Sequence, residues 1–248
     1  MTGRLMVEFK DVAKSFSDRK VLIEVSFTVG EGEALCIMGR SGIGKSVTLK
    51  LMIGLLKPDS GQVCIDSENI APLPEKDLSR VRRNIGFLFQ SAGLFDSFTV
   101  GDNLALPLRR FDKTKSQSEI EQAVHDALKA VGLEKDKDKM PAELSGGMRK
   151  RAGLARALVL SPKLLLVDEP SSGLDRITAG EIDELLLQVK TERRTTLVIV
   201  THDVSCARRV ADQVAVIDGG NIACLGTLDE LQSSENQVVR ELTSGASK

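Results

Sequence analysis

The chain has 248 residues, of which 42% are hydrophobic, and its 34 Lys and Arg residues nearly balance its 35 Asp and Glu residues. A protein that binds nucleic acid by neutralising phosphates usually carries a basic excess, so the composition argues against a nucleic-acid partner. The four cysteines lie far apart with no Cys-x-x-Cys pair, which favours reduced core residues in a cytosolic protein. Because no apolar run reaches about 18 residues and residues 1–10 lack a continuous apolar segment, we expect neither a membrane span nor secretion.

Short apolar runs separated by turn-forming residues predict an α/β fold, with helices between many of the strands. Asp218-Gly219-Gly220-Asn221 is a hairpin turn signal between the last two expected strands. The expected strands are residues 5–9, 25–29, 33–38, 62–65, 84–89, 163–167, 196–200, 214–218 and 221–225.

The middle of the chain, from residue 91 to residue 143, carries little strand pattern. Ile120, Val124, Leu128 and Val131 recur at helical spacing and mark one apolar face. We therefore expect a helical insert there. The mixed-charge stretch at residues 135–139 is expected to be a solvated loop.

The segment from Gly39 to Ser46 matches the G-x-x-x-x-G-K-S template of a loop that holds nucleotide phosphates. A buried-strand pattern precedes it and helical apolar spacing follows it, so the expected strand, loop and helix are all present. The glycines let backbone N–H groups converge on phosphate oxygens, and Lys45 is expected to neutralise the β- and γ-phosphates while Ser46 holds Mg²⁺. The predicted nucleotide-binding residues here are Gly39, Arg40, Ser41, Gly42, Ile43, Gly44, Lys45, Ser46 and Val47.

Two carboxylates, Asp168 and Glu169, follow the apolar strand pattern at residues 163–167. At the carboxyl end of such a strand Asp168 can orient the shell of the Mg²⁺ ion, while Glu169 can activate a water molecule on the γ-phosphate. Two acids in this place can also serve as the negative charges that open a helix. The phosphate loop upstream favours the catalytic interpretation.

Five further elements resemble the motifs of ATP-binding-cassette (ABC) ATPases. Leu144-Ser145-Gly146-Gly147-Met148 resembles the LSGGQ signature and ends 20 positions before Asp168, as the family requires. Gln90 resembles the glutamine of the family's Q-loop. The others are Asp175 in a segment like the D-loop (172–175), His202 in Thr201-His202-Asp203, and the aromatic Phe16.

The resemblance implies a P-loop NTPase with a mixed sheet and flanking helices, an antiparallel β subdomain and a helical subdomain. The implied layout is a single domain over residues 1–248, with a core of residues 1–90 and 144–232, a helical subdomain of residues 91–143 and a tail of residues 233–248. The implied reaction is hydrolysis of ATP to ADP and phosphate, with Mg²⁺ held by Ser46, Gln90 and Asp168. The implied catalytic residues are Lys45, Gln90, Glu169 and His202.

The family also works as a head-to-tail dimer that sandwiches two ATP molecules. In that arrangement Ser145, Gly146 and Gly147 would contact the γ-phosphate bound by the other copy, and Asp175 would reach across the interface. His202 would position the water and Glu169 for the attack on the γ-phosphate, as expected for a residue after the strand pattern at 196–200. The other histidine, His125, is expected to be a surface or packing residue.

Two residues depart from the family pattern. Met148 replaces the usual glutamine of the signature, which puts in doubt any polar contact of that side chain near the ribose. Phe16 replaces the more frequent tyrosine, and its ring can still stack on adenine without discriminating strongly between bases. Phe16 is also compatible with a place in the core.

Within the family, residues 89–97, 103–108 and 144–151 look like those of the ATPase subunits of Mla/Mce-type lipid transporters. The implied partners are an integral-membrane permease, an Mce-domain lipid-binding protein beyond it and a STAS-domain subunit, with the chain on the cytoplasmic face of the inner membrane. The run from Ala92 to Leu108 is expected to contact the permease, with packing inside the insert as the alternative. Val238, Val239 and Leu242 could form an apolar stripe for a neighbour or belong to a frayed terminus.

Three other functions compete with lipid transport. An importer ATPase for amino acids or methionine would share every catalytic motif and differ only at residues 89–108 and 144–151. A soluble cassette protein that acts on ribosomes or DNA usually carries two cassettes or a long coiled-coil insertion, which do not fit in 248 residues. A catalytically silent binding module is disfavoured because Lys45, Asp168, Glu169 and His202 are all present.

Overall fold

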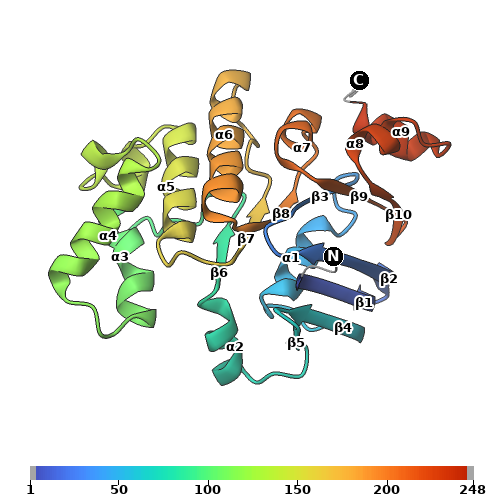
Figure 1. The fold of residues 1–248 in the computed structure, drawn as a ribbon, viewed down its shortest axis with the longest axis horizontal. Helices are drawn as coiled ribbons and strands as arrows, with labels where there is room; N and C mark the ends of the chain where they lie inside the picture. The colour runs from blue at the N-terminus through green and yellow to red at the C-terminus, as the bar shows by residue number, and fades with distance from the viewer. Residues whose placement is uncertain (1–3, 245–248) are drawn as a thin grey trace.

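The computed structural model describes residues 4–244, which form two sheets with helices around and between them (Figure 1). The larger sheet has the order β10-β9-β3-β8-β7-β6, and all its neighbouring pairs are parallel except the hairpin of β9 and β10. Its strands are β3 (Ala34–Met38), β6 (Ile85–Leu88), β7 (Leu164–Asp168), β8 (Thr196–Val200), β9 (Gln213–Asp218) and β10 (Asn221–Gly226).

The smaller sheet is antiparallel and has the order β2-β1-β4-β5. Its strands are β1 (Leu5–Phe16), β2 (Arg19–Gly30), β4 (Ser60–Ile65) and β5 (Glu68–Asn69). Together with the mixed sheet and its flanking helices, this sheet confirms the expected P-loop α/β fold class.

The helices pack in three places, and three apolar cores result. The first core lies between the two sheets around α1, the second lies between the other face of the large sheet and α5, α6, α7, α8 and α9, and the third lies among α3, α4 and α5. The helices are α1 (Lys45–Met52), α2 (Glu75–Arg82), α3 (Val100–Phe111), α4 (Gln117–Lys129), α5 (Gly146–Leu158), α6 (Arg176–Arg193), α7 (Val204–Val210), α8 (Leu228–Gln232) and α9 (Gln237–Thr243), with 3-10 turns at Glu134–Asp136 and Pro141–Glu143.

Burial explains why the central strands were readable from sequence. All five residues of β3, β7 and β8 are buried, because helices or the second sheet cover both faces of the large sheet. Strands buried on both faces are continuous apolar runs rather than alternating ones. The expected strand at residues 196–200 coincides with β8.

The first strand is longer than the sequence pattern predicts. β1 continues from Phe9 to Phe16, paired with β2, through register shifts and a positive φ of 48° at Asp11. A bulge of this kind breaks the alternation of apolar and polar residues that marks a half-buried strand. The short β5 was missed as well, since two residues carry no periodicity.

The predicted turn between the last two strands is confirmed. Gly219 and Gly220 have φ values of 54° and 83°, as a type I′ hairpin requires at both central positions. Glycine adopts these angles without the steric cost that a side chain would add.

The helical insert expected after β6 contains α3 and α4, and the predicted apolar face is buried: Ile120, Val124, Leu128 and Val131 all belong to the third core. The stretch at residues 135–139 is more than a solvated loop. The carbonyl oxygens of Lys137 and Lys139 accept hydrogen bonds from the N–H groups of Gly101 and Val100, so this stretch caps the start of α3.

Several other expectations concern single side chains. His125 is exposed, as expected, and the cysteines are free thiols, with Cys36, Cys64 and Cys206 buried. In the tail, Val239 is fully buried and Leu242 packs beside it in the second core, so this stripe serves the chain's own fold. Residues 245–248 of the expected tail lie outside the described residues. Among residues 4–244, no helix is both long enough and apolar enough to cross a bilayer.

Asp183 on α6 is a buried carboxylate whose ionisation should weaken the fold. It is 2% exposed, and among the described residues no group donates a hydrogen bond to its Oδ1. Burial raises the pKa of Asp183, against a smaller lowering by the Cys206 thiol. The folded chain therefore holds the proton more tightly than the unfolded chain, and this group makes stability fall as pH rises from the unfolded to the folded pKa.

Asp183→Asn should therefore raise the melting temperature at pH 8. Asn keeps the shape of the side chain but cannot ionise, so the variant avoids the cost of the buried carboxylate charge, and 1 kcal/mol corresponds to roughly 2–4 °C in a chain of this size. Calorimetry from pH 4 to pH 8 should show that the gain shrinks as pH falls. Asp138→Asn, at an exposed position, serves as the control. A lower melting temperature for Asp183→Asn at pH 8 would contradict this account.

Candidate active site

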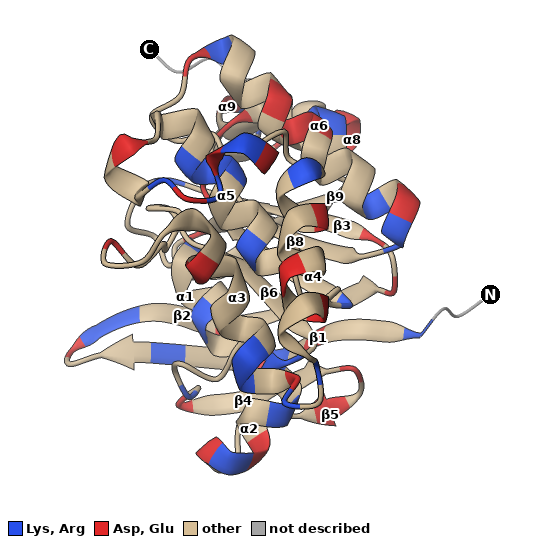
Figure 2. Cartoon of the chain, turned by 90° about the vertical axis from the view of Figure 1, so that its left-hand side faces the viewer, with Lys and Arg blue, Asp and Glu red and all other residues tan. Residues whose placement is uncertain are grey.

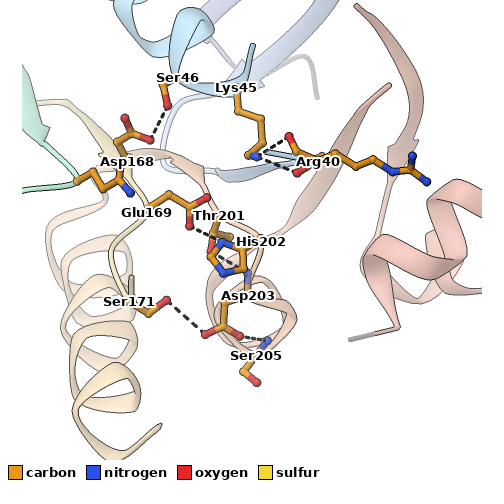
Figure 3. A network of polar contacts seen from close by, with 12 residues as sticks. Arg40, Lys45, Ser46, Asp168, Glu169, Ser171, Thr201, His202, Asp203 and Ser205 are labelled. Carbon is orange, nitrogen blue, oxygen red and sulfur yellow. Dashed lines mark hydrogen bonds and ion pairs between the residues drawn. The ribbon is translucent and has the colours of Figure 1, made fainter. Parts of the chain in front are cut away.

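The functional side chains meet at the carboxyl edge of three neighbouring parallel strands, β3, β8 and β7 (Figure 3). The phosphate loop follows β3, Glu169 follows β7, and His202 comes two residues after β8. Carboxyl ends of parallel strands lie at one edge of the sheet, which is where ligands bind in such folds. The topology therefore brings together residues that are more than 150 positions apart in the chain.

The phosphate loop is shaped for anions. Gly44 is the N-cap of α1, with a φ of 116° and no side-chain hydrogen bond to the first N–H groups of the helix. A Cβ at Gly44 would lie 2.6 Å from the Val21 side chain, and one at Gly39 would lie 2.6 Å from the Ile217 carbonyl oxygen. Glycine is thus required at both positions. The free N–H groups and the positive end of α1 fit a phosphate group.

Lys45 lies inside this loop. Its Nζ donates hydrogen bonds to the carbonyl oxygens of Gly39 at 2.7 Å and Arg40 at 3.1 Å, and the residue is 8% exposed. Burial lowers the pKa of Lys45, while Glu169 and Asp168 act in the opposite direction. The ammonium group is therefore already positioned beside the cradle and desolvated, where it can neutralise phosphate oxygens.

The other residues of the loop divide into two groups. Arg40, Ser41 and Gly42 are exposed, and the guanidinium of Arg40 points away from Lys45 (Figure 3). Ile43 and Val47 pack against the core between the sheets. Their side chains anchor the loop, and the loop offers its backbone to a nucleotide.

Ser46 and Asp168 form the pair predicted for Mg²⁺. The Ser46 hydroxyl donates a hydrogen bond of 2.9 Å to Oδ1 of Asp168, which is 8% exposed. Burial raises the pKa of Asp168, against lowering by the Ser46 hydrogen bond and by Lys50, Lys150 and Lys45. Mg²⁺ keeps several waters and binds through one or two carboxylates plus substrate phosphates, so one hydroxyl and one carboxylate beside a phosphate cradle fit it.

Glu169 and His202 are in contact. His202 Nδ1 lies 2.8 Å from Glu169 Oε2, and the Glu169 side chain is 13% exposed whereas that of His202 is 67% exposed. Glu169 has a φ of 48°, which only a small share of residues other than glycine adopt. Its N–H donates to the Val200 carbonyl oxygen at 2.8 Å, which fixes this backbone at the end of β8. The unusual backbone aims the carboxylate at His202.

Hydrogen bonds hold the loop that carries His202. The Asp203 N–H donates to the Thr201 hydroxyl at 3.0 Å, and the Asp203 carboxylate accepts from the N–H of Ser205 at 2.8 Å, which caps α7. The Ser171 hydroxyl donates to the Asp203 carboxylate at 3.3 Å (Figure 3). Together with the contact between Glu169 and His202, this bond links the loop after β7 to the loop after β8 twice.

Phe16 lies near the phosphate loop through a contact that the sequence did not reveal. It ends β1, is 44% exposed and pairs across the hairpin with Arg19. Arg19 in turn donates a hydrogen bond of 2.9 Å to the Gly42 carbonyl oxygen. The exposure excludes a place in the core, and the tether brings the ring to the edge of the loop. An exposed arginine in a hairpin has no sequence signal that would have singled it out.

Gln90 is exposed two residues beyond β6, and its backbone is tied to the site by Lys150 of α5. The Lys150 Nζ donates to the carbonyl oxygens of Gln90 at 2.6 Å and Glu169 at 2.8 Å. Lys150 falls within the motif at residues 144–151, and its position there indicates no role of its own.

The signature residues 145–147 lie apart from the phosphate loop of their own chain, and two of them have roles in its fold. Ser145 is exposed and caps α5 through Met148 N–H, while a Cβ at Gly147 would lie 2.4 Å from the Thr178 side chain. Gly146 is exposed. Among the described residues, no hydrogen bond joins residues 145–147 to residues 39–46.

Asp175 and Met148 have partners of their own. Asp175 caps α6 by accepting hydrogen bonds from Ile177 and Thr178. These bonds lower the pKa of Asp175, and those from Thr178 have the largest effect. The Met148 side chain packs against the third core. It therefore acts as an apolar contact between α5 and the insert.

The comparisons with known proteins agree with this geometry. The family model described as "ABC transporter" matches residues 22–172. The chain is 41% identical, over 96% of its length and 69% of the relative's, to the probable ribonucleotide transport ATP-binding protein mkl of Mycobacterium leprae. It is 38% identical, over 91% of its length and 70% of the relative's, to the methionine import ATP-binding protein MetN of Clostridium tetani. The chain thus spans about two thirds of the length of these relatives.

Solved structures show the same fold. The ATP-binding cassette MJ0796, in a dimeric post-hydrolysis state bound to ADP and phosphate, aligns with a TM-score of 0.83 and 34% identity over 90% of this chain and 98% of that one. The cbiO1 protein of Clostridium perfringens, part of the ABC transporter complex cbiONQ, aligns with a TM-score of 0.83 and 30% identity over 98% of this chain and 96% of that one. ATP hydrolysis with Mg²⁺ is the reaction that the family match and the ADP-bound neighbour support. The chain therefore belongs to the ABC transporter family, as an ATPase domain.

Proposed function

We propose that the chain energises the movement of phospholipid by a separate integral-membrane permease of Mla/Mce type, from the cytoplasmic face of the inner membrane. The observation that carries the permease contact is a set of exposed apolar side chains directly after Gln90. In this assembly an Mce-domain lipid-binding protein and a STAS-domain subunit are partners through the complex. The lipid assignment is supported by the resemblance of residues 89–97, 103–108 and 144–151 to lipid-transport ATPases.

The exposed set, called the docking patch, consists of Phe95, Phe98 and Leu106, which are 50%, 39% and 36% exposed. The two rings lie 5.7 Å apart between centroids. The proposed contact within residues 92–108 is limited to these three, since Leu104 is fully buried in the third core and Leu94 packs against it. An exposed apolar group of this kind is typical of a surface that a partner covers.

Hydrogen bonds with Asn103 hold the backbone of the docking patch at Phe95 and Phe98. Asn103, itself fully buried, accepts a hydrogen bond from the N–H of Phe95 at 2.7 Å and donates to the carbonyl oxygens of Phe95, Phe98 and Thr99. The face formed by α3 and α4 mixes Lys and Arg with Asp and Glu (Figure 2). Because charges of both signs occur on this face, a partner would recognise it by its exposed apolar side chains.

In ATP hydrolysis, the residues at the carboxyl edge of the large sheet have different roles. Lys45 and the backbone of residues 39–46 hold the phosphates, and Ser46, Asp168 and the Gln90 side chain hold the Mg²⁺ shell. Mg²⁺ supplies charge neutralisation on the phosphate oxygens. Glu169 accepts the proton of the attacking water, and His202 contacts the γ-phosphate while it orients Glu169 through their 2.8 Å contact. Phe16 stacks on the base.

The site is completed by a second copy of the chain. Ser145 and Gly146 are exposed at the start of α5, apart from the phosphate loop, with Gly147 buried next to them, and Asp175 opens α6 at an exposed position. Helix N-termini favour anions, so the start of α5 suits the γ-phosphate held by another copy. Two ATP molecules would then lie between two chains.

A solute importer is the second candidate, and the names of the relatives favour it. Proteins named for methionine import and for ribonucleotide transport match this chain over more than 90% of its length. An importer ATPase would use the same catalytic edge, so only the partner and its cargo separate the two functions.

Glu169→Gln should keep ATP binding and lose hydrolysis, because it removes a general base worth about 10²–10⁴-fold while the phosphate loop stays intact. Lys45→Ala should instead weaken ATP binding, because a charge-assisted contact to phosphate is lost. Phosphate release and nucleotide affinity, measured on each purified variant, separate the two effects. Near-normal turnover of Glu169→Gln, or unchanged affinity of Lys45→Ala, would remove the residue concerned from its role.

Phe95→Asp should reduce assembly with the permease and transport-coupled hydrolysis, since it places a charge in the docking patch. ATP binding by the isolated subunit should stay close to wild type because the side chain is half exposed. Leu225→Asp, on β10 and 40% exposed, is the matched control and should assemble normally. Intact assembly of Phe95→Asp would place the docking surface elsewhere.

The cargo is tested on the intact complex, isolated from membranes in detergent and then reconstituted. Mass spectrometry should identify the permease, the Mce-domain protein and bound phospholipid, and added phospholipid should stimulate hydrolysis. Stimulation by methionine or ribonucleotides, in a complex that holds no specific lipid, would favour the importer and contradict the lipid proposal.

A further inference from the structure

Lys150 is a buried cation that touches the backbone of two residues of the active site. It lies on α5, is 5% exposed and donates hydrogen bonds to the carbonyl oxygens of Gln90 and Glu169 at 2.6 Å and 2.8 Å. Burial lowers the pKa of Lys150, while Glu169 and then Asp168 act to raise it. A buried lysine is tolerated only when its N–H groups find acceptors, and here both acceptors belong to loops of the site.

The two carbonyl oxygens occupy equivalent places in the sheet. Leu88 of β6 pairs with Val167 of β7 in the last step of their parallel ladder. Gln90 lies two residues beyond Leu88, and Glu169 lies two residues beyond Val167. Lys150 therefore joins the two loops just where the strands stop holding them together.

The same face of α5 holds the rest of the loop after Gln90. A Cβ at Gly153 would lie 2.6 Å from the Ala92 carbonyl oxygen, so the loop backbone packs directly on the helix. Arg156 donates a hydrogen bond to the Gly93 carbonyl oxygen, and its Cζ lies 5.8 Å from the centre of the Phe95 ring. Residues 150, 153 and 156 follow one another at helical spacing, which places them along one side of α5.

We propose that Lys150 is a positioning residue for hydrolysis: by binding the carbonyl oxygens of Gln90 and Glu169 together, it makes the placement of the catalytic carboxylate depend on the conformation of the loop that leads to the docking patch. Glu169 is sensitive to such a link because its backbone has a positive φ of 48° and is held on the other side by Val200. Lys150 itself touches neither nucleotide nor water in this role.

The test compares three variants by ATP affinity, turnover and melting temperature. Lys150→Met keeps a similar length and removes the donors, whereas Lys150→Gln keeps N–H donors on a shorter side chain. Lys190→Met is the matched control, because Lys190 also donates to a backbone carbonyl oxygen, that of Val210 at 3.1 Å, away from the site. A misplaced catalytic group costs about 10²-fold in rate, so Lys150→Met should lower kcat by about 10- to 100-fold with little change in ATP affinity.

Lys150→Gln should fall between Lys150→Met and wild type, and Lys190→Met should keep wild-type kcat at equal folded fraction. Hydrogen exchange adds a structural readout in the Glu169→Gln background, where ATP is not consumed. ATP should slow amide exchange at residues 90–95, and Lys150→Met should abolish that effect.

Two results would overturn the proposal. One is a folded Lys150→Met whose kcat matches wild type and whose ATP-dependent protection, in the Glu169→Gln background, matches that of Glu169→Gln alone. The other is a loss of kcat in Lys150→Met that is fully explained by a smaller folded fraction, so that kcat at equal folded fraction matches that of Lys190→Met. If Lys150→Met does not fold, Lys150→Gln decides by the same split between kcat and ATP affinity.

Discussion

The parallel register of β3, β8 and β7 is the constraint on which the rest of the site depends. Asp168 pairs with Val200 at the end of the ladder, and the next N–H, that of Glu169, bonds the Val200 carbonyl oxygen. A slip of one residue would turn every side chain to the opposite face and separate Asp168 from Ser46. Full burial of all three strands makes such a slip costly, so the core that stabilises the fold also fixes the distances at the edge.

Within one chain this edge brings together the residues proposed to hold phosphate and metal, and under the proposed function it lacks part of the catalytic site. The phosphate loop, Asp168, Glu169 and His202 lie together, whereas Ser145 and Asp175 cap their own helices at exposed positions. The element that connects the two regions is α5. It begins at the signature, contacts the active site through Lys150 and approaches the docking patch through Arg156.

The sequence was most informative where chemistry demands fixed residues at fixed spacing. Glycine is needed at positions 39 and 44 because a side chain there would clash with its neighbours. Asp168 lies at the end of β7 and His202 follows β8, and both strands are continuous apolar runs in the sequence. Arg19 and Lys150 could not be predicted, because their importance comes from tertiary contacts with carbonyl oxygens 19 to 60 positions away. The bulged part of β1 was missed since its alternation fails, and the apolar run at residues 92–108 could not be divided into buried and exposed side chains without knowing how α3 packs.

The central claim is that one chain supplies half of each hydrolytic site, and mixed dimers test it most directly. Lys45→Ala chains and Ser145→Arg chains, each inactive as homodimers, are combined and the heterodimer is isolated with two different affinity tags. One of its two interfaces then contains an intact Lys45 and an intact Ser145, so the account predicts partial recovery of phosphate release. A heterodimer that forms and stays as inactive as both parents would contradict the composite site.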